Sequence, residues 1–157
     1  MATRSTISLK VSEGDKGKVF HFDENKLPKG LSCINEEIDK VGDVKVEHDY
    51  LTIYHHWDGY PEGVGETLVE QFNTYDSILN LLCGGDASSI NGDTICQYCA
   101  WRGEAWEDVQ PTQSDTEPSV REEYAYLFKD GKWFFKAYDS EAWSDLNEYL
   151  GNNVLSN

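Results

Sequence analysis

The sequence predicts an α+β fold, an antiparallel sheet with several short helices packed on it, as a single domain over residues 1–157. Three observations predict it. Residues 6–11 alternate polar and apolar side chains, residues 64–72 have apolar side chains at helical spacing, and residues 124–135 surround an Asp-Gly turn. A chain of 157 residues with 39% hydrophobic content is long enough to form one core.

The first third of the chain predicts mostly strands. In order, we expect a half-buried strand over 6–11, a partner strand over 18–22, a short helix over 31–41 ended by Gly42, and a hairpin of residues 44–46 and 51–54 around residues 48–50. The helix is expected because Leu31, Ile34 and Ile38 recur at helical spacing.

The remaining elements alternate between helices and strands. They are an amphipathic helix after Gly63, a helix over 75–83, a strand over 94–101, an exposed acidic loop over about 102–118, a hairpin over 124–135, and a last helix capped by Ser140 with Trp143, Leu146, Tyr149 and Leu150 on one face. Asp130 and Gly131 tolerate the positive φ that a two-residue hairpin turn requires.

The charge is strongly negative and unevenly distributed. The net charge is −16, and between residues 51 and 128 only Arg102 and Arg121 face fourteen carboxylates. Such a surface repels nucleic acid and acidic membranes and attracts basic proteins. The residues we expect to contact a basic partner are Glu104, Trp106, Glu107, Asp108, Glu122 and Glu123. Trp101, Trp106 and Tyr124 are expected to be exposed aromatic anchors among these acids.

No run of about 18 apolar residues is present, and the first residues lack the pattern of a secretory signal. We therefore expect a cytoplasmic protein that binds neither membrane nor nucleic acid directly. The four cysteines are expected to be reduced thiols.

The most chemically dense stretch is the motif His56, Trp57, Asp58, Gly59, Tyr60 and Pro61. His56 and Asp58 share one face of a strand, so they could act as a general base or as half of a metal site. The alternative is a structural turn in which Trp57 and Tyr60 pack in the core. We favour the turn and expect no cofactor, because metal sites need three or four ligands.

Two further patterns have a functional and a structural interpretation. Gly63-Val64-Gly65 at a helix start is typical of phosphate-binding loops, but no Lys or Arg is near it in the sequence. Cys96 and Cys99 have the spacing of a redox pair or half a zinc site, and no second pair accompanies them. A glycine-rich helix entry and two core cysteines are the preferred interpretations.

The chain resembles an uncharacterised family of small bacteriophage and prophage proteins. The resemblance covers about a third of the chain: residues 3–7, residues 54–68 with His-Trp-Asp-Gly-Tyr-Pro, residues 79–89, and residues 126–133 with Leu-Phe-Lys-Asp-Gly-Lys-Trp. Family members run from the first strand almost directly into the motif, whereas residues 12–50 intervene here. The resemblance implies a phage setting and assigns no catalytic or ligand-binding residue.

Together these observations predict a phage-related, non-enzymatic binding protein. Its acidic surface would mimic nucleic acid and inhibit a basic host enzyme that handles nucleic acid, such as a CRISPR effector or a restriction system. The alternative is a small enzyme, or a nucleotide- or metal-binding protein, that uses Arg4, His56 and Asp58. A structural component of a virion is a third hypothesis.

Overall fold

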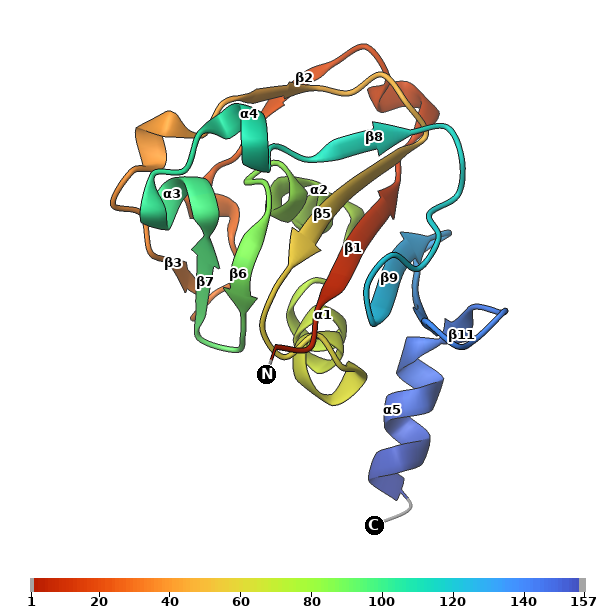
Figure 1. Ribbon diagram of the computed structural model, residues 1–157. Helices are drawn as coiled ribbons and strands as arrows, with labels where there is room; N and C mark the ends of the chain where they lie inside the picture. The colour runs from red at the N-terminus through yellow and green to blue at the C-terminus, as the bar shows by residue number, and fades with distance from the viewer. Residues whose placement is uncertain (1, 156–157) are drawn as a thin grey trace.

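A mixed β-sheet forms the centre of the protein, whose computed structural model describes residues 2–155 (Figure 1). The strands in spatial order are β11 (Ser144–Asp145), β10 (Lys132–Ala137), β9 (Tyr124–Lys129), β1 (Ser5–Lys10), β5 (Tyr50–His55), β6 (Ala87–Ile90), β7 (Thr94–Gln97) and β3 (Ser32–Cys33), and β8 (Thr112–Ser114) also pairs with β5. β2 (Val19–His21) and β4 (Asp43–Lys45) form a separate two-stranded sheet.

The helices are short. They are α1 (Glu66–Gln71), α2 (Tyr75–Leu82), α3 (Tyr98–Arg102), α4 (Trp106–Val109) and α5 (Leu146–Leu155), with the 3-10 turns η1 (Glu13–Asp15), η2 (Glu24–Lys26) and η3 (Ile38–Lys40) and the π-helical turn η4 (Pro61–Gly65). The predicted α+β class is confirmed. Antiparallel pairs predominate in the sheet, and β1–β9, β5–β6 and β3–β7 are parallel.

The hydrophobic core lies between one face of the sheet and the helices α1 and α2. Ile7, Leu9 and Ile53 lie there, each at most 1% exposed, with Leu68 of α1 and Leu81 of α2. Trp133 from β10 is also buried, and its indole N–H donates to the carbonyl oxygen of Phe72, just after α1, at 2.7 Å. The same core therefore joins the C-terminal hairpin to both helices.

The predicted strand over 6–11 is confirmed, but it is buried on both faces. β1 lies in the middle of the sheet and pairs antiparallel with β5 and parallel with β9. Even its polar Ser8 is fully buried and Thr6 is 8% exposed. The polar face that the alternation predicts is therefore present, and another segment of the chain covers it.

One local prediction, the turn at Asp130-Gly131, is confirmed in detail, and the structure adds a local feature at the start of the predicted helix over 75–83. The hairpin of β9 and β10 turns at Asp130 (φ 54°) and Gly131 (φ 78°), the backbone conformation that this turn requires. α2 begins with a capping box in which Thr74 and Ser77 each accept a hydrogen bond from the other's backbone N–H.

Strand pairing in the first third of the chain was predicted wrongly. Residues 44–46 and 51–54 do not form a hairpin, and residues 18–22 do not pair with the first strand. β2 pairs with β4 instead, and β5 pairs with β1. In that pair Ser5 lies opposite His55, fifty residues later in the chain. The reason is burial: beside β1, β5 leaves Leu51 and Ile53 at most 1% exposed.

Four other elements also differ from prediction. Residues 31–41 form only β3 and η3, because Ser32 and Cys33 pair with β7. The strand expected over 94–101 becomes the helix α3 at Tyr98, and the loop expected over 102–118 contains α4 and β8. The last helix begins at Leu146, where the Asp145 carboxylate accepts the backbone N–H of Glu148, so Ser140 does not cap it.

Candidate functional site

The second face of the sheet is polar and faces away from α1 and α2. Thr6 and Ser8 of β1 and Thr52 and Tyr54 of β5 point to this side, because side chains alternate along a strand. The hydroxyl groups of Ser8 and Thr52 are hydrogen-bonded at 2.7 Å. This face therefore offers hydroxyl groups where the other face offers aliphatic side chains.

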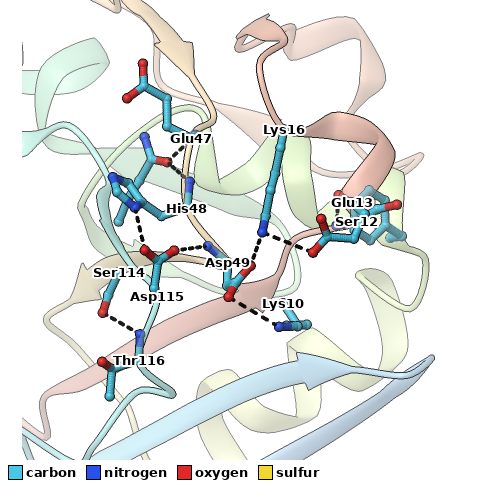
Figure 2. A network of polar contacts seen from close by, with 12 residues as sticks. Lys10, Ser12, Glu13, Lys16, Glu47, His48, Asp49, Ser114, Asp115 and Thr116 are labelled. Carbon is cyan, nitrogen blue, oxygen red and sulfur yellow. Dashed lines mark hydrogen bonds and ion pairs between the residues drawn. The ribbon is translucent and has the colours of Figure 1, made fainter.

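Residues 112–122 cross this polar face, and their first half is held by contacts with the segment before β5. The Gln113 side-chain oxygen accepts the backbone N–H groups of Glu47 at 2.8 Å and His48 at 3.2 Å. Asp115 accepts the backbone N–H of Asp49 at 3.1 Å and contacts His48 Nδ1 at 3.2 Å (Figure 2). The His48 contact lowers the pKa of the Asp115 carboxyl from its ordinary value.

An ion-pair network extends this anchor to β1. Asp49 pairs with Lys16 and, at 3.9 Å, with Lys10 at the end of β1, and Lys16 also pairs with Glu13 at 3.0 Å (Figure 2). Asp49 and Glu13 raise the pKa of Lys16 to about 12. Residues 47–49 thus contact the ends of both β1 and β8.

Glu117 holds the second half of the crossing segment. Its carboxylate accepts the indole N–H of Trp143 at 2.8 Å and pairs with Lys129 Nζ at 3.5 Å. Between this anchor and β5 lies a cavity of about 330 Å³. Its lining includes Thr6, Thr52, Tyr54, Asp86, Glu117, Arg121 and Glu122, and we call it the β5–β8 pocket.

Asp86 is the most unusual side chain of the β5–β8 pocket. Its Oδ1 accepts the backbone N–H of Tyr54 at 2.9 Å, its own N–H donates to the carbonyl of Val109, and its carbonyl accepts the N–H of Tyr98. Burial raises the pKa of the Asp86 carboxyl to about 6, and the charge of Glu104 acts in the same direction. An acid that is costly to ionise, held rigidly at a cavity, is typical of a functional site.

Replacing Asp86 by Asn is expected to raise the free energy of unfolding by about 1–2 kcal/mol at pH 8 and by almost nothing at pH 4. The unfolded carboxyl ionises near 3.8 and the folded one near a pKa of 6, so the folded chain holds this proton more tightly. The stability of the wild type therefore falls as the pH rises from 4 through 6. Asn keeps an oxygen for the Tyr54 N–H and carries no charge.

Urea unfolding of both proteins at pH 8 and pH 4 measures this difference, with exposed Asp93→Asn as the control. An equal gain at both pH values would contradict a buried ionised carboxylate. Both proteins share the other titratable and charged groups around position 86, so the difference between them reports on the Asp86 carboxyl alone. These groups are Arg4, Tyr54, His56, Tyr98, Arg102, Glu104, Glu117, Arg121 and Glu122.

A row of three aromatic rings connects the pocket to the His-Trp-Asp-Gly-Tyr-Pro motif. Tyr54 lines the pocket and its hydroxyl contacts His56 Nδ1 at 2.6 Å. The His56 ring packs edge-on against Trp57, with ring centroids 4.8 Å apart. Trp57 is 47% exposed and Tyr60 is 39% exposed, so neither is the core aromatic that the turn interpretation expects.

His56 and Asp58 do not meet. The partner of His56 is Tyr54, and no hydrogen bond joins His56 to Asp58 in the described part of the chain. Asp58 has a positive φ of 58°, and its carbonyl oxygen accepts the backbone N–H of Val64 at 2.9 Å. The geometry thus does not assemble a His-carboxylate pair.

Gly59 and Pro61 form the buried part of the motif. The backbone N–H of Gly59 donates to the carbonyl of Thr3 at 2.8 Å, and its carbonyl accepts the hydroxyl of Tyr126 at 2.6 Å. Pro61 is at the first position of η4, where a missing N–H costs nothing. These residues attach the turn to β1 and β9, so this half of the motif is structural.

The glycines of η4 do not form an open anion site. The backbone N–H of Gly63 donates to Tyr60 and that of Val64 donates to Asp58. Gly65 is buried against the rings and side chains of Tyr126 and Leu146. The two amides that a phosphate would need are already used within the turn.

The predicted acidic residues fall into three places. Glu107 and Asp108 are exposed on α4 and Glu104 is exposed between α3 and α4. Glu122 lines the β5–β8 pocket, and Glu123 lines a separate hollow with Tyr138 and Asp139. No ion pair in the described part of the chain involves any of the five predicted acids.

The aromatic residues predicted as exposed anchors are all half-buried. Trp106 packs against the core, and its indole fills the space above Gly42, where a Cβ atom would lie 2.4 Å from Nε1. Trp101 and Tyr124 are also half-buried. The exposed aromatics Trp57 and Tyr60 come from the motif instead, and neither lines the β5–β8 pocket.

The cysteines are unpaired thiols. Cys96 lies on β7 and Cys99 on α3, so the two are not in one strand as expected. Burial raises the pKa of the Cys83 thiol to about 12 and also raises that of Cys99. In residues 2–155 no three His, Cys, Asp or Glu side chains group as metal ligands.

Comparison with known proteins gives no match: no family model, no curated protein and no solved structure corresponds to this chain. Within the described residues, no helix has the length and apolar content needed to cross a membrane.

Sequence reasoning missed Thr6, Tyr54 and Asp86 as site residues. The alternation in 6–11 already places Thr6 on a polar face, and Tyr54 precedes the motif directly. Asp86 follows Gly84-Gly85, and no sequence pattern connects it to the other site residues. Only folding brings β6, which begins just after Asp86, beside the end of β5.

Proposed function

We propose that this protein is a non-enzymatic binding protein whose acidic surface engages a basic protein. One observation is central to this proposal: none of the five predicted acids forms an ion pair in the described part of the chain. Glu104, Glu107, Asp108, Glu122 and Glu123 keep their charge unneutralised by any Lys, Arg or His side chain within ion-pair distance.

The distribution of cations supports the proposal. The lysines that form ion pairs do so with acids outside this set, such as Lys10 and Lys16 with Asp49, and Lys129 with Glu117. None of these pairs involves the acids of α4, Glu104 or Glu122, so those carboxylates remain free to attract a partner. The negative potential of such carboxylates steers basic partners and repels nucleic acid.

In the phage setting that the sequence resemblance implies, the basic partner is a host enzyme that handles nucleic acid, such as a CRISPR effector or a restriction enzyme. Its groove presents Arg and Lys side chains to phosphates. Exposed carboxylates can satisfy the same side chains, and the protein then acts as an inhibitor by competing with nucleic acid.

Reversing all five charges, with Lys at positions 104, 107, 108, 122 and 123, is expected to abolish capture of the partner while the fold remains. The assay is a pull-down from bacterial lysate at low and high salt, followed by nuclease assays of the retained enzymes with added protein. Capture and inhibition by the wild type should weaken steeply with salt, because the attraction is electrostatic.

A matched control reverses five exposed acids elsewhere: Glu66, Glu70, Asp76, Glu141 and Glu148. Both variants carry the same net charge, so only the position of the charges differs. The proposal fails if the two variants lose the partner equally, or if capture by the wild type does not depend on salt.

A further inference from the structure

We propose that the β5–β8 pocket receives an arginine side chain of the basic partner. This inference rests on the proposed function and names the side chain of the partner that the pocket binds. Four features of the pocket point to this occupant: its size, a buried hydroxyl without a partner, the excess of carboxylates, and the ring of Tyr54.

The cavity of about 330 Å³ is at the small end of ligand sites, which suits one long side chain better than a helix or a strand. Its walls are rigid, because Gln113, Asp115 and Glu117 anchor the segment that crosses the sheet. A preformed pocket of this kind needs little ordering when it binds.

The hydroxyl of Thr6 is a buried polar group at the pocket that has no partner among the described residues. Thr6 lines the pocket, is 8% exposed, and its Oγ1 is buried without a hydrogen-bond partner in the described structure. Ser8 and Thr52 on the same face satisfy one another. Buried hydroxyl groups are normally paired, so an N–H donor from a ligand would complete this one.

The charges of the pocket select a cation. Asp86, Glu117 and Glu122 line it, against one basic side chain, Arg121. Glu117 is already bound to Trp143 and Lys129, whereas Glu122 has no ion pair and Asp86 accepts only the Tyr54 amide among the described hydrogen bonds. Two carboxylates therefore remain available for a cationic donor.

The ring of Tyr54 favours arginine over lysine. Tyr54 lines the pocket together with Asp86 and Glu122, so an aromatic ring and carboxylates face the same cavity. A guanidinium group can stack on a ring and donate several N–H groups in one plane, whereas an ammonium group is compact and more strongly hydrated.

The test is an NMR titration of the full ¹⁵N-labelled chain with N-acetyl-arginine methylamide. We expect saturable shifts of the Thr6, Tyr54 and Asp86 amides, weaker ones with the lysine analogue, and none with the neutral glutamine analogue. Absence of saturation, or equal shifts with glutamine, would overturn the inference.

Three variants assign the contacts. Asp86→Asn keeps the shape of the pocket and should weaken binding of the arginine compound about tenfold, and Thr6→Val should weaken it about threefold. Arg121→Gln removes the like charge and should leave binding equal or tighter. If instead the pocket binds inorganic phosphate and Arg121→Gln abolishes that binding, the pocket is an anion site and the inference is wrong.

Failure here is distinguishable from failure of the proposed function. The arginine compound reports on the wild-type pocket without any protein partner. Glu122 is among the five reversed acids, so Asp86→Asn, which lies outside that set, is the variant that tests the pocket alone. If the compound does not bind but charge reversal still abolishes partner capture, the acidic surface acts without the pocket.

Discussion

Lowering the pH from 7 to 3 is expected to remove about 4 kcal/mol of the free energy of unfolding through His55 alone. His55 is fully buried, and burial lowers the pKa of its ring to about 3 from an ordinary value of 6.5, with the charge of His56 as a smaller cause. In the unfolded chain the ring takes up a proton near pH 6.5, whereas the folded protein resists it. The contribution is complete above pH 6.5 and is lost as the pH falls toward 3.

The hydrogen bonds of His55 explain why protonation is so unfavourable. The backbone N–H of Ile90 donates to Nε2 at 3.2 Å, which leaves the proton on Nδ1, and Nδ1 contacts the Ser5 hydroxyl at 3.1 Å. A proton on Nε2 would face the Ile90 N–H directly. Acid therefore acts on the contact between β5 and β6.

Urea unfolding between pH 7 and pH 3 measures this dependence, and His55→Gln should flatten it because a Gln oxygen can accept the Ile90 N–H without titrating. The control is His21→Gln, at an exposed position. If His55→Gln does not fold, the wild-type ring can be followed by NMR, and a ring that titrates near 6.5 would refute the prediction. The Asp86 carboxyl has the opposite effect on stability, because its contribution falls as the pH rises, and the expected change is smaller.

Replacing Gly59 by Ala is expected to cost about 3 kcal/mol or more of the free energy of unfolding. A Cβ atom there would lie 2.6 Å from the carbonyl oxygen of Thr3 and 2.9 Å from Ser5 Cβ. Ser5 begins β1, which is paired on both sides and so resists displacement, and Thr3 lies two residues before it. The shift would also disturb the 2.6 Å hydrogen bond between the Tyr126 hydroxyl and the Gly59 carbonyl.

Thermal and urea unfolding of Gly59→Ala measure this loss. Gly14→Ala is the control, because nothing lies within 4 Å of a Cβ atom at that position. Equal stability of the two variants would show that the motif turn is not tightly attached to β1. A large loss confined to Gly59→Ala separates the structural half of the motif from the exposed Trp57 and Tyr60.

Local patterns predicted the elements whose stabilising contacts are close in sequence. The β9–β10 hairpin depends on Asp130 and Gly131, and the start of α2 depends on a capping box between Thr74 and Ser77. The expected helix over 31–41 failed because its apolar spacing was also compatible with a two-residue strand, and pairing with β7 decided between them.

The candidate site was only partly predictable for the same reason. The charge distribution already singled out Glu104 and Glu122, and the motif singled out His56 and Trp57. Of these four residues only Glu122 lines the β5–β8 pocket, which also needs Thr6, Asp86 and Arg121 from three separate parts of the chain. No spacing rule connects such residues.

By itself the sequence determined the α+β class, the negative charge between residues 51 and 128, and the turn chemistry at Asp130-Gly131, because these depend on composition, short-range periodicity and the backbone preferences of single residues. Only the tertiary structure decided that β5 pairs with β1 and that residues 112–122 cross the polar face to form a pocket. These arrangements depend on burying Ile7, Leu51 and Ile53 together, and that burial is a property of the whole chain.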